Sequence, residues 1–148
     1  LYFVMKFMRL ILSLCMISTI SCSLPKECPE FDFNSLEKTT TLNNNPYTGR
    51  CSTYVNGNIR SIQQYLNGLD YGKWVFYYES GKVQTKGRFN ENGQRVGTWR
   101  YYHEDGSKSQ ISKYSKQGIR TGLWKVYDKD GKLIDLIDYS DYPEQSDE

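Results

Sequence analysis

A ten-residue pattern recurs three times in the second half of the chain and limits what the chain can fold into. The pattern is Gly-x-Trp-x-x-Tyr-x-x-x-Gly, written as "GKWVFYYESG", "GTWRYYHEDG" and "GLWKVYDKDG". The copies begin at Gly72, Gly97 and Gly122, so the period is 25 residues. A fixed period of this length is typical of stacked supersecondary units, each of which buries its apolar side against its neighbours. The repeat therefore indicates architecture before it indicates chemistry.

The repeat extends beyond this pattern and has a fourth, degenerate copy. An aromatic ring follows each turn glycine by eight residues, at Phe89, Tyr114 and Tyr139. The degenerate copy begins at Gly49 and continues with Tyr54, Gly57, Tyr65 and Gly68, and it carries Cys51 where the other copies carry tryptophan. We therefore expect a repeat domain over residues 47–139 with about four copies.

Each copy predicts a β-hairpin. "KWVFYY" is a short, ring-rich run suited to a strand, and "KVQTKGRF" reads as the returning strand. The turns between them, "ESG", "EDG" and "KDG", end in glycine, which adopts the positive φ that tight hairpin turns require. Hydrophobic residues make up only 38% of the chain and aromatic residues 15%, which favours thin layers of buried rings. We predict an all-β fold in which successive hairpins form one elongated meander.

Alternation along the strands separates two faces of the predicted sheet. Trp74, Trp99 and Trp124 point to the more apolar side, which should be the packed side. The other side carries the candidate binding residues Tyr77, Arg100, Tyr102, Lys125 and Tyr127. Tyrosine and arginine are enriched at binding hot spots, so this side is either a binding face or a solvated one. The spacing alone does not determine which face of the sheet the returning strands cover.

With its downstream ring and glycine, the pattern resembles the bacterial variant of the MORN (membrane occupation and recognition nexus) repeat. The resemblance covers residues 47–139, with Cys51 in place of the first tryptophan and a period longer than is usual for the family. It implies an elongated β-meander and a non-catalytic interaction role. Bacterial proteins of this kind are commonly labelled as antitoxin components of toxin–antitoxin systems or as MORN-repeat lipoproteins.

The N-terminal segment reads as a signal peptide over residues 1–21. Lys6 and Arg9 precede the apolar run "LILSLCMISTI", which is too short to span a bilayer comfortably. The run ends at "ISCS", and this resembles the lipobox of bacterial lipoproteins, in which the cysteine, here Cys22, carries the lipid. The resemblance implies a lipid-anchored protein of the bacterial cell envelope, facing the periplasm or the exterior. The alternative is an ordinary cleaved signal with an incidental cysteine.

Removal of the signal peptide would leave a neutral protein. The chain has 19 Lys and Arg against 17 Asp and Glu, and the loss of Lys6 and Arg9 makes the two counts equal at 17. Long-range attraction to nucleic acid is therefore not expected. The C-terminal residues 140–148, "SDYPEQSDE", read as an acidic tail.

Cys28 and Cys51 form an even pair outside the signal peptide, and we expect a disulfide between them; the alternative is two free thiols. Residues 22–46 contain no repeat. We predict a tether from the lipid that continues into an irregular cap over the first hairpin, held by the disulfide. A plain flexible tether is the alternative.

Catalytic and metal-binding signatures are not found. The chain has one histidine, His103, which we expect to lie in solvent in a turn. "YDKDGK" resembles a calcium loop, but Val126 and Ile137 stand where oxygen ligands are needed. We therefore expect no enzyme activity, no cofactor and no metal.

Three functions remain to be weighed. The first is an envelope interaction module that binds a protein or peptide, with a glycan as an alternative ligand, and that reaches the membrane through its lipid anchor. The second is an antitoxin or immunity component, for which a toxin-like neighbouring gene would be the discriminating observation. The third is an enzyme, which no group of residues supports.

Overall fold

The computed structural model describes residues 26–141. Within this range, all regular secondary structure consists of β-strands. The strands of the main sheet are β4 (Gly49–Val55), β5 (Asn58–Leu66), β6 (Leu69–Asp70), β7 (Gly72–Tyr77), β8 (Val83–Phe89), β9 (Arg95–Tyr102), β10 (Lys108–Tyr114), β11 (Leu123–Tyr127) and β12 (Leu133–Asp138). A smaller sheet consists of β1 (Asp32–Asn34), β2 (Thr39–Leu42) and β3 (Asn45–Pro46).

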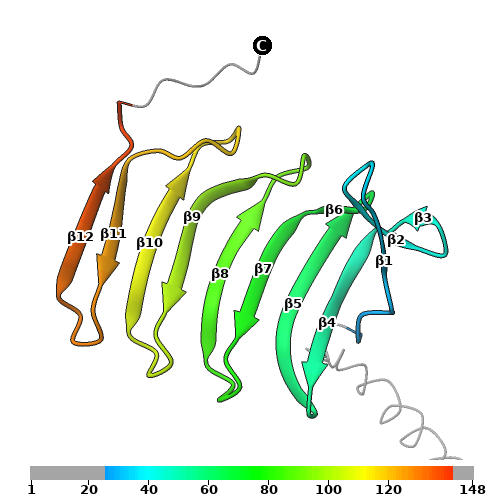
Figure 1. Ribbon diagram of the computed structural model, residues 1–148, viewed down its shortest axis with the longest axis horizontal. Coiled ribbons are helices and arrows are strands. Elements are labelled where there is room, and N and C mark those ends of the chain that lie inside the picture. Colours follow the sequence, from blue (N-terminus) through cyan, green and yellow to red (C-terminus); the bar gives the residue numbers. More distant parts are fainter. Residues whose placement is uncertain (1–25, 142–148) are drawn as a thin grey trace, which may run out of the picture.

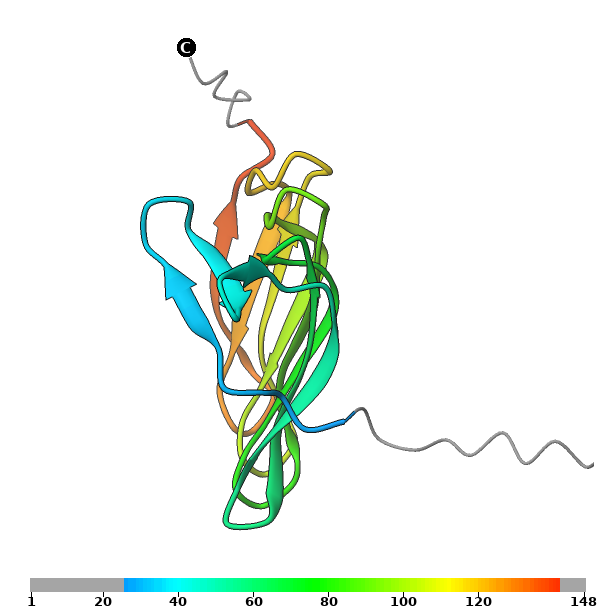
Figure 2. The ribbon, with the colours of Figure 1, turned by 90° about the vertical axis from the view of Figure 1, so that its right-hand side faces the viewer.

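The main sheet is an antiparallel meander. Its strands run in the order β12-β11-β10-β9-β8-β7-β5-β4, with the short β6 paired to β5 (Figure 1). The chain thus adds one strand after another and makes no crossover. Seen from the side, the sheet is a single twisted layer (Figure 2). The predicted all-β meander of hairpins is confirmed.

The four copies of the repeat are the four hairpins β4–β5, β7–β8, β9–β10 and β11–β12. Turn glycines stand where the sequence placed them, with positive φ at Gly57, Gly81, Gly106 and Gly131. Each hairpin also contains a β-bulge in its returning strand, because one residue has no partner across the hairpin. The skipped residues are Arg60, Gln84, Ser109 and Ile134. A bulge changes the face on which the following side chains lie. For this reason, sequence spacing alone could not assign the side chains of the returning strands to a face.

A second irregularity joins each hairpin to the one before it. Gly72, Gly97 and Gly122, which open the repeated pattern, have φ of 63°, 66° and 59°. Glycine adopts this conformation at the lowest cost because it has no Cβ. Two residues further on, each tryptophan donates its indole N–H to a carbonyl oxygen of the preceding hairpin. The acceptors are Gln64 for Trp74 at 2.8 Å, Arg88 for Trp99 at 3.2 Å and Lys113 for Trp124 at 3.0 Å.

The core is a line of aromatic rings on one face of the sheet, which we name the tryptophan face. The rings include Tyr65, Trp74, Phe89 and Trp99, and neighbouring rings in this group lie 5.0–5.3 Å apart between centroids. Trp99 is only 1% exposed, although no second sheet covers it. Its ring lies against Gly87, where any Cβ would clash with the indole. A glycine beneath the ring therefore allows a one-layer sheet to bury a tryptophan.

Two arginines cover the outer side of this ring line. The guanidinium of Arg95 lies 4.4 Å from the centroid of Trp99, and that of Arg120 lies 5.2 Å from the centroid of Trp124. Such cation–π contacts also shield the rings from water. Asp70 stands at the matching position of the preceding repeat; burial raises the pKa of its carboxyl, and the charge of Arg95 partly offsets this effect.

The N-terminal end of the sheet is covered by β1–β3 and a disulfide. Cys28 and Cys51 are bonded, as expected from the sequence, and Cys28 also pairs its backbone with Ser52 at the edge of β4. Phe31 packs against Tyr47 and Tyr65, which extends the ring line into this cap. The segment for which the sequence predicts an irregular cap contains three short strands. The segment "EKTTTLNNNP" is rich in threonine and in turn residues, so its sequence shows no apolar alternation from which strands could be predicted.

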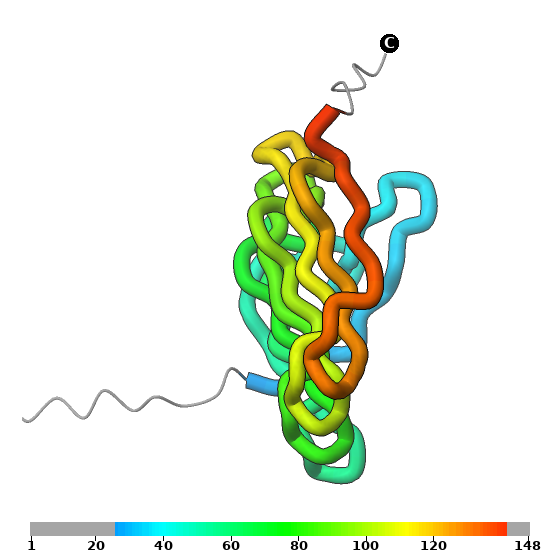
Figure 3. Tube along the Cα trace, turned by 90° about the vertical axis from the view of Figure 1, so that its left-hand side faces the viewer, coloured from blue at the N-terminus to red at the C-terminus, as the bar shows by residue number. Residues whose placement is uncertain are grey.

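The opposite end of the sheet terminates at β12, the outermost strand (Figure 3). Leu133, Ile134, Leu136 and Ile137 are all exposed there. Residues 26–141 contain no helix long and apolar enough to cross a membrane. The predicted signal peptide, the lipidation site Cys22 and most of the acidic tail, residues 142–148, lie outside the described residues.

Candidate binding face

The five predicted binding residues lie on the face opposite the tryptophans, which we name the tyrosine face. Arg100 and Lys125 are both register partners of Ile111, one from each side of β10, so the two cations share a face. Tyr102 and Tyr127 follow them by two residues along β9 and β11. Tyr77 follows Val75 by two residues in β7 and completes the set.

A continuous row of side chains crosses the centre of the tyrosine face. It consists of Ser52, Ile62, Val75, Lys86, Arg100, Ile111, Lys125 and Leu136, each in register with the next. Ser52 and Ile62 at one end of the row are buried and Leu136 at the other end is exposed, whereas three of the four residues between Val75 and Leu136 are cationic. The adjacent row contains the repeated tyrosines. This face therefore offers apolar, aromatic and positively charged groups at regular spacing.

The repeated tyrosines are half-buried rather than free in solvent. The ammonium of Lys86 lies 5.5 Å from the ring centroid of Tyr102. Tyr102 and Tyr127 line a hollow of about 430 Å3 together with Lys108 and the turn glycines of two hairpins. Pockets for small ligands begin at roughly this size, so the hollow can accept a side chain of a partner.

The sequence had suggested that His103 lies free in solvent, but its side chain is half-buried and makes a contact. Its Nε2 lies 3.0 Å from the carbonyl oxygen of Tyr127, to which an N–H at this position would donate. In the preceding repeat, the hydroxyl of Tyr78 donates to the carbonyl oxygen of Tyr102 at 2.7 Å. Both side chains thus link one hairpin to the next, and they hold the repeated tyrosines in line. Their matching position in the repeat is the signal that could have revealed this role.

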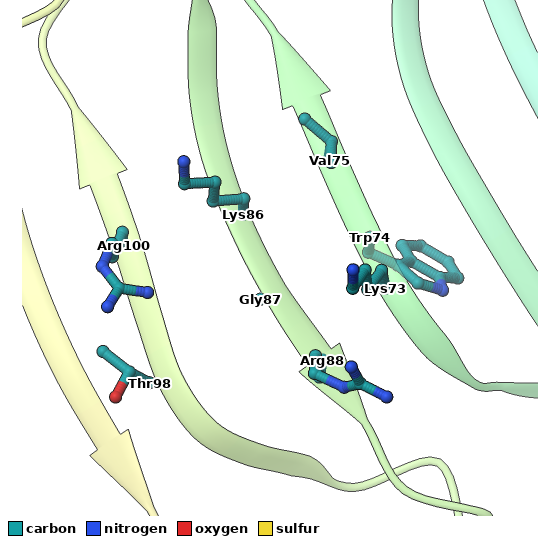
Figure 4. A pocket seen from close by; sticks show the side chains of 8 residues that line it. All are labelled: Lys73, Trp74, Val75, Lys86, Gly87, Arg88, Thr98 and Arg100. Carbon is teal, nitrogen blue, oxygen red and sulfur yellow. The ribbon is translucent and has the colours of Figure 1, made fainter. Parts of the chain in front are cut away.

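A second hollow lies where β7, β8 and β9 meet, and we name it the basic pocket (Figure 4). It has a volume of about 300 Å3, and its lining includes the four cationic side chains Lys73, Lys86, Arg88 and Arg100. The lining also includes Val75 on β7 and Thr98 on β9, and none of the lining residues is acidic. Sequence reasoning identified only Arg100 of these four cations. Lys86 and Arg88 were missed because they come from the returning strand β8, whose faces the bulge had obscured, whereas Lys73 lies on β7, where alternation alone could have found it.

The described residues contain no group of three or more His, Cys, Asp or Glu side chains placed to hold a metal ion. The perturbed titrating groups lie elsewhere. Burial raises the pKa of Tyr65 to about 12, with further contributions from the charges of Asp70 and Tyr47. Tyr65 belongs to the ring line of the tryptophan face, so this shift reflects packing of the core.

Comparison with known families supports the interpretation of the repeat. Residues 70–91, 95–116 and 120–141 each match the family described as "MORN repeat variant". These segments correspond to the hairpins β7–β8, β9–β10 and β11–β12, so each of these three hairpins is similar to the repeat of that family. Such repeats are consistent with a protein-interaction module. The degenerate copy that begins at Gly49 lies outside the match.

No curated protein matches the chain. Among solved structures, the chain is similar to a chain in the "Crystal structure of GtfA/B complex bound to UDP and GlcNAc", with 14% identity and a TM-score of 0.35. The match covers 80% of this chain and 29% of that chain, so this chain spans less than a third of its neighbour's length. A likeness at this TM-score defines neither a fold nor a function.

Proposed function

We propose that the chain is a non-catalytic interaction module that binds a protein or peptide on its tyrosine face. The observation that carries this proposal is that the two faces of the sheet carry different kinds of side chains. The tryptophan face holds the core, whereas the tyrosine face repeats rings and cations that the core does not use. Tyrosine and arginine provide large contact areas and several hydrogen-bond donors, and they are frequent at the centres of protein interfaces.

The elongated meander suits this role. Each hairpin presents the same positions, Tyr77, Tyr102 and Tyr127, so a partner can contact several repeats at once. Extended surfaces built from repeats are commonly used in this way. Catalysis is not part of the proposal, because the tyrosine face offers no nucleophile paired with a base.

We place the module at the bacterial cell envelope, anchored through a lipid on Cys22. The Cys28–Cys51 disulfide supports this placement, since such bonds persist mainly outside the cytoplasm. The Cys22→Ser variant is expected to lose labelling by a fatty-acid probe and to move from the membrane to the soluble fraction. Cys28→Ser is the matched control and should keep both properties. Unchanged membrane association of Cys22→Ser would contradict the anchor.

Crosslinking in intact cells, followed by capture and mass spectrometry, tests the proposed function. The expected result is a protein that is enriched reproducibly with the wild-type chain. A toxin-like protein among the captured species would favour the immunity role in the periplasm. If no protein is enriched under conditions that crosslink a known envelope complex, the interaction function is wrong.

A further inference from the structure

We propose that the basic pocket binds an acidic segment of the protein partner, in extended conformation, with carboxylates on alternate residues. This inference rests on the proposed function and names the chemistry of what the tyrosine face recognises. The pocket is formed by Lys73 on β7, Lys86 and Arg88 on β8, and Arg100 on β9 (Figure 4).

The cations in this pocket face one another directly. Lys73 is the register partner of Arg88, and Lys86 is the register partner of Arg100. Like charges opposite each other across antiparallel strands are destabilising. All four side chains are exposed, and within residues 26–141 those of Lys73, Arg88 and Arg100 have no hydrogen bond or ion pair. The fold thus tolerates two unfavourable pairs that no acidic group compensates.

Acidic residues are absent from the surrounding strands. Strands β5, β7, β8, β9 and β10 contain no Asp or Glu. The acidic residues of these repeats lie in the turns, at Glu79, Glu91, Glu104 and Asp105, and in the short strand β6, where Asp70 is near Arg95 rather than the basic pocket. Positive charge is therefore concentrated at the centre of the sheet although the mature chain is neutral. An anionic ligand would relieve the repulsion that the protein itself leaves in place.

The spacing of the cations matches an extended peptide. Lys86 and Arg88 are two residues apart on β8, and on a strand such side chains are separated by roughly 6.6–6.8 Å. Side chains on alternate residues of a bound extended peptide have the same separation, so each carboxylate can reach one cation pair. Arginine also suits carboxylates because its planar guanidinium can donate two parallel hydrogen bonds. Val75 stands in the same row as Lys86 and Arg100 and provides an apolar contact for the peptide beside that cation pair.

A peptide fits these observations better than a nucleic acid or a bilayer. Nucleic-acid affinity grows with the number of phosphates contacted, and four clustered cations on a neutral chain provide few such contacts. The pocket is a hollow of about 300 Å3, which suits side chains of a peptide rather than a flat membrane surface. Both alternatives are included in the test below.

The test uses a short labelled peptide with glutamate at alternate positions and serine between them. A matched peptide carries glutamine in place of glutamate. The protein variant is Arg88→Glu, and Lys116→Glu, in the turn after β10, is the control with the same change in charge. We expect the acidic peptide to bind the wild type and Lys116→Glu in a salt-dependent manner, and the glutamine peptide to bind neither. Binding to Arg88→Glu should be weaker by roughly tenfold or more.

Thermal melting separates this outcome from misfolding. In Arg88→Glu, the new carboxylate stands opposite Lys73, so the melting temperature should be equal to or above that of the wild type. Equal peptide binding by Arg88→Glu and wild type would overturn the proposal. Binding of single-stranded DNA or anionic vesicles, but not of the acidic peptide, would also overturn it. If a protein captured from intact cells is retained equally by Arg88→Glu, the acidic-segment proposal fails while the interaction function stands.

Discussion

Replacement of Trp99 by alanine is expected to unfold the repeat domain or to leave it marginally stable. Trp99 is 1% exposed and lies in the central hairpin, between the ring of Phe89 and the guanidinium of Arg95. Removal of a buried ring of this size typically costs about 3–5 kcal/mol, which is a large part of the free energy of unfolding of a small domain. Its indole N–H would also no longer satisfy the carbonyl of Arg88.

Thermal or urea unfolding followed by circular dichroism measures this loss. Tyr102→Ala, three residues further along β9 and on the tyrosine face, is the control. Its side chain is half-buried and contacts Lys86, so the expected cost is about 1 kcal/mol. If Tyr102→Ala were as destabilising as Trp99→Ala, both rings would belong to the core, and the assignment of a free binding face would be wrong.

Loss of the Cys28–Cys51 disulfide is expected to have the second-largest effect. The bond closes a loop with a sequence separation of 23 residues, and the chain-entropy relation gives about 3 kcal/mol for a loop of this length. Cys51 is also 1% exposed and packs with Tyr65 and Trp74, so it stands in the place of the missing first tryptophan. Reduction should therefore release the cap and loosen the first hairpin.

Unfolding with and without a reducing agent measures this contribution, and mass spectrometry of the unreduced protein should show a linked pair of peptides. Cys28→Ala reports the loss of the bond alone. Cys51→Ala should cost more, because it also removes a side chain from the core. Two freely alkylated thiols at Cys28 and Cys51 in the unreduced protein would contradict the bond, and an unchanged melting temperature on reduction would contradict its role in stability.

The regular part of this structure could be predicted from sequence because it is repeated. Three copies with tryptophan, tyrosine and turn glycine in the same places identify a hairpin more clearly than any one copy does. Alternation in β7, β9 and β11 then assigned Trp99 and Tyr102 to opposite faces, as the register confirms. After its opening glycine, the first strand of each hairpin keeps strict alternation as far as the turn, because the bulge of the hairpin lies in the returning strand.

The remaining features depend on irregularities that carry no strong sequence signal. The bulges at Gln84 and Ser109 occur at polar residues without a turn motif, and the bulge at Gln84 decides which face receives Lys86 and Arg88. The strands of the cap are too short and too polar to show alternation. The covering roles of Arg95 and Arg120 follow from a shared position four residues before a tryptophan, which becomes informative only when the strand geometry is known.

We infer that the tryptophan face holds the core and that the tyrosine face binds the partner. The most direct test of this assignment compares Tyr101→Ala with Tyr102→Ala in the capture experiment from intact cells. The two tyrosines are neighbours in β9, both are half-buried, and they lie on opposite faces of the sheet. Both variants are assayed at a temperature at which melting shows them to be folded. We expect Tyr102→Ala to lose the captured protein and Tyr101→Ala to retain it. If Tyr102→Ala retained the captured protein and Tyr101→Ala lost it, the partner would bind on the tryptophan face, which would contradict the assignment of the tyrosine face as the binding face.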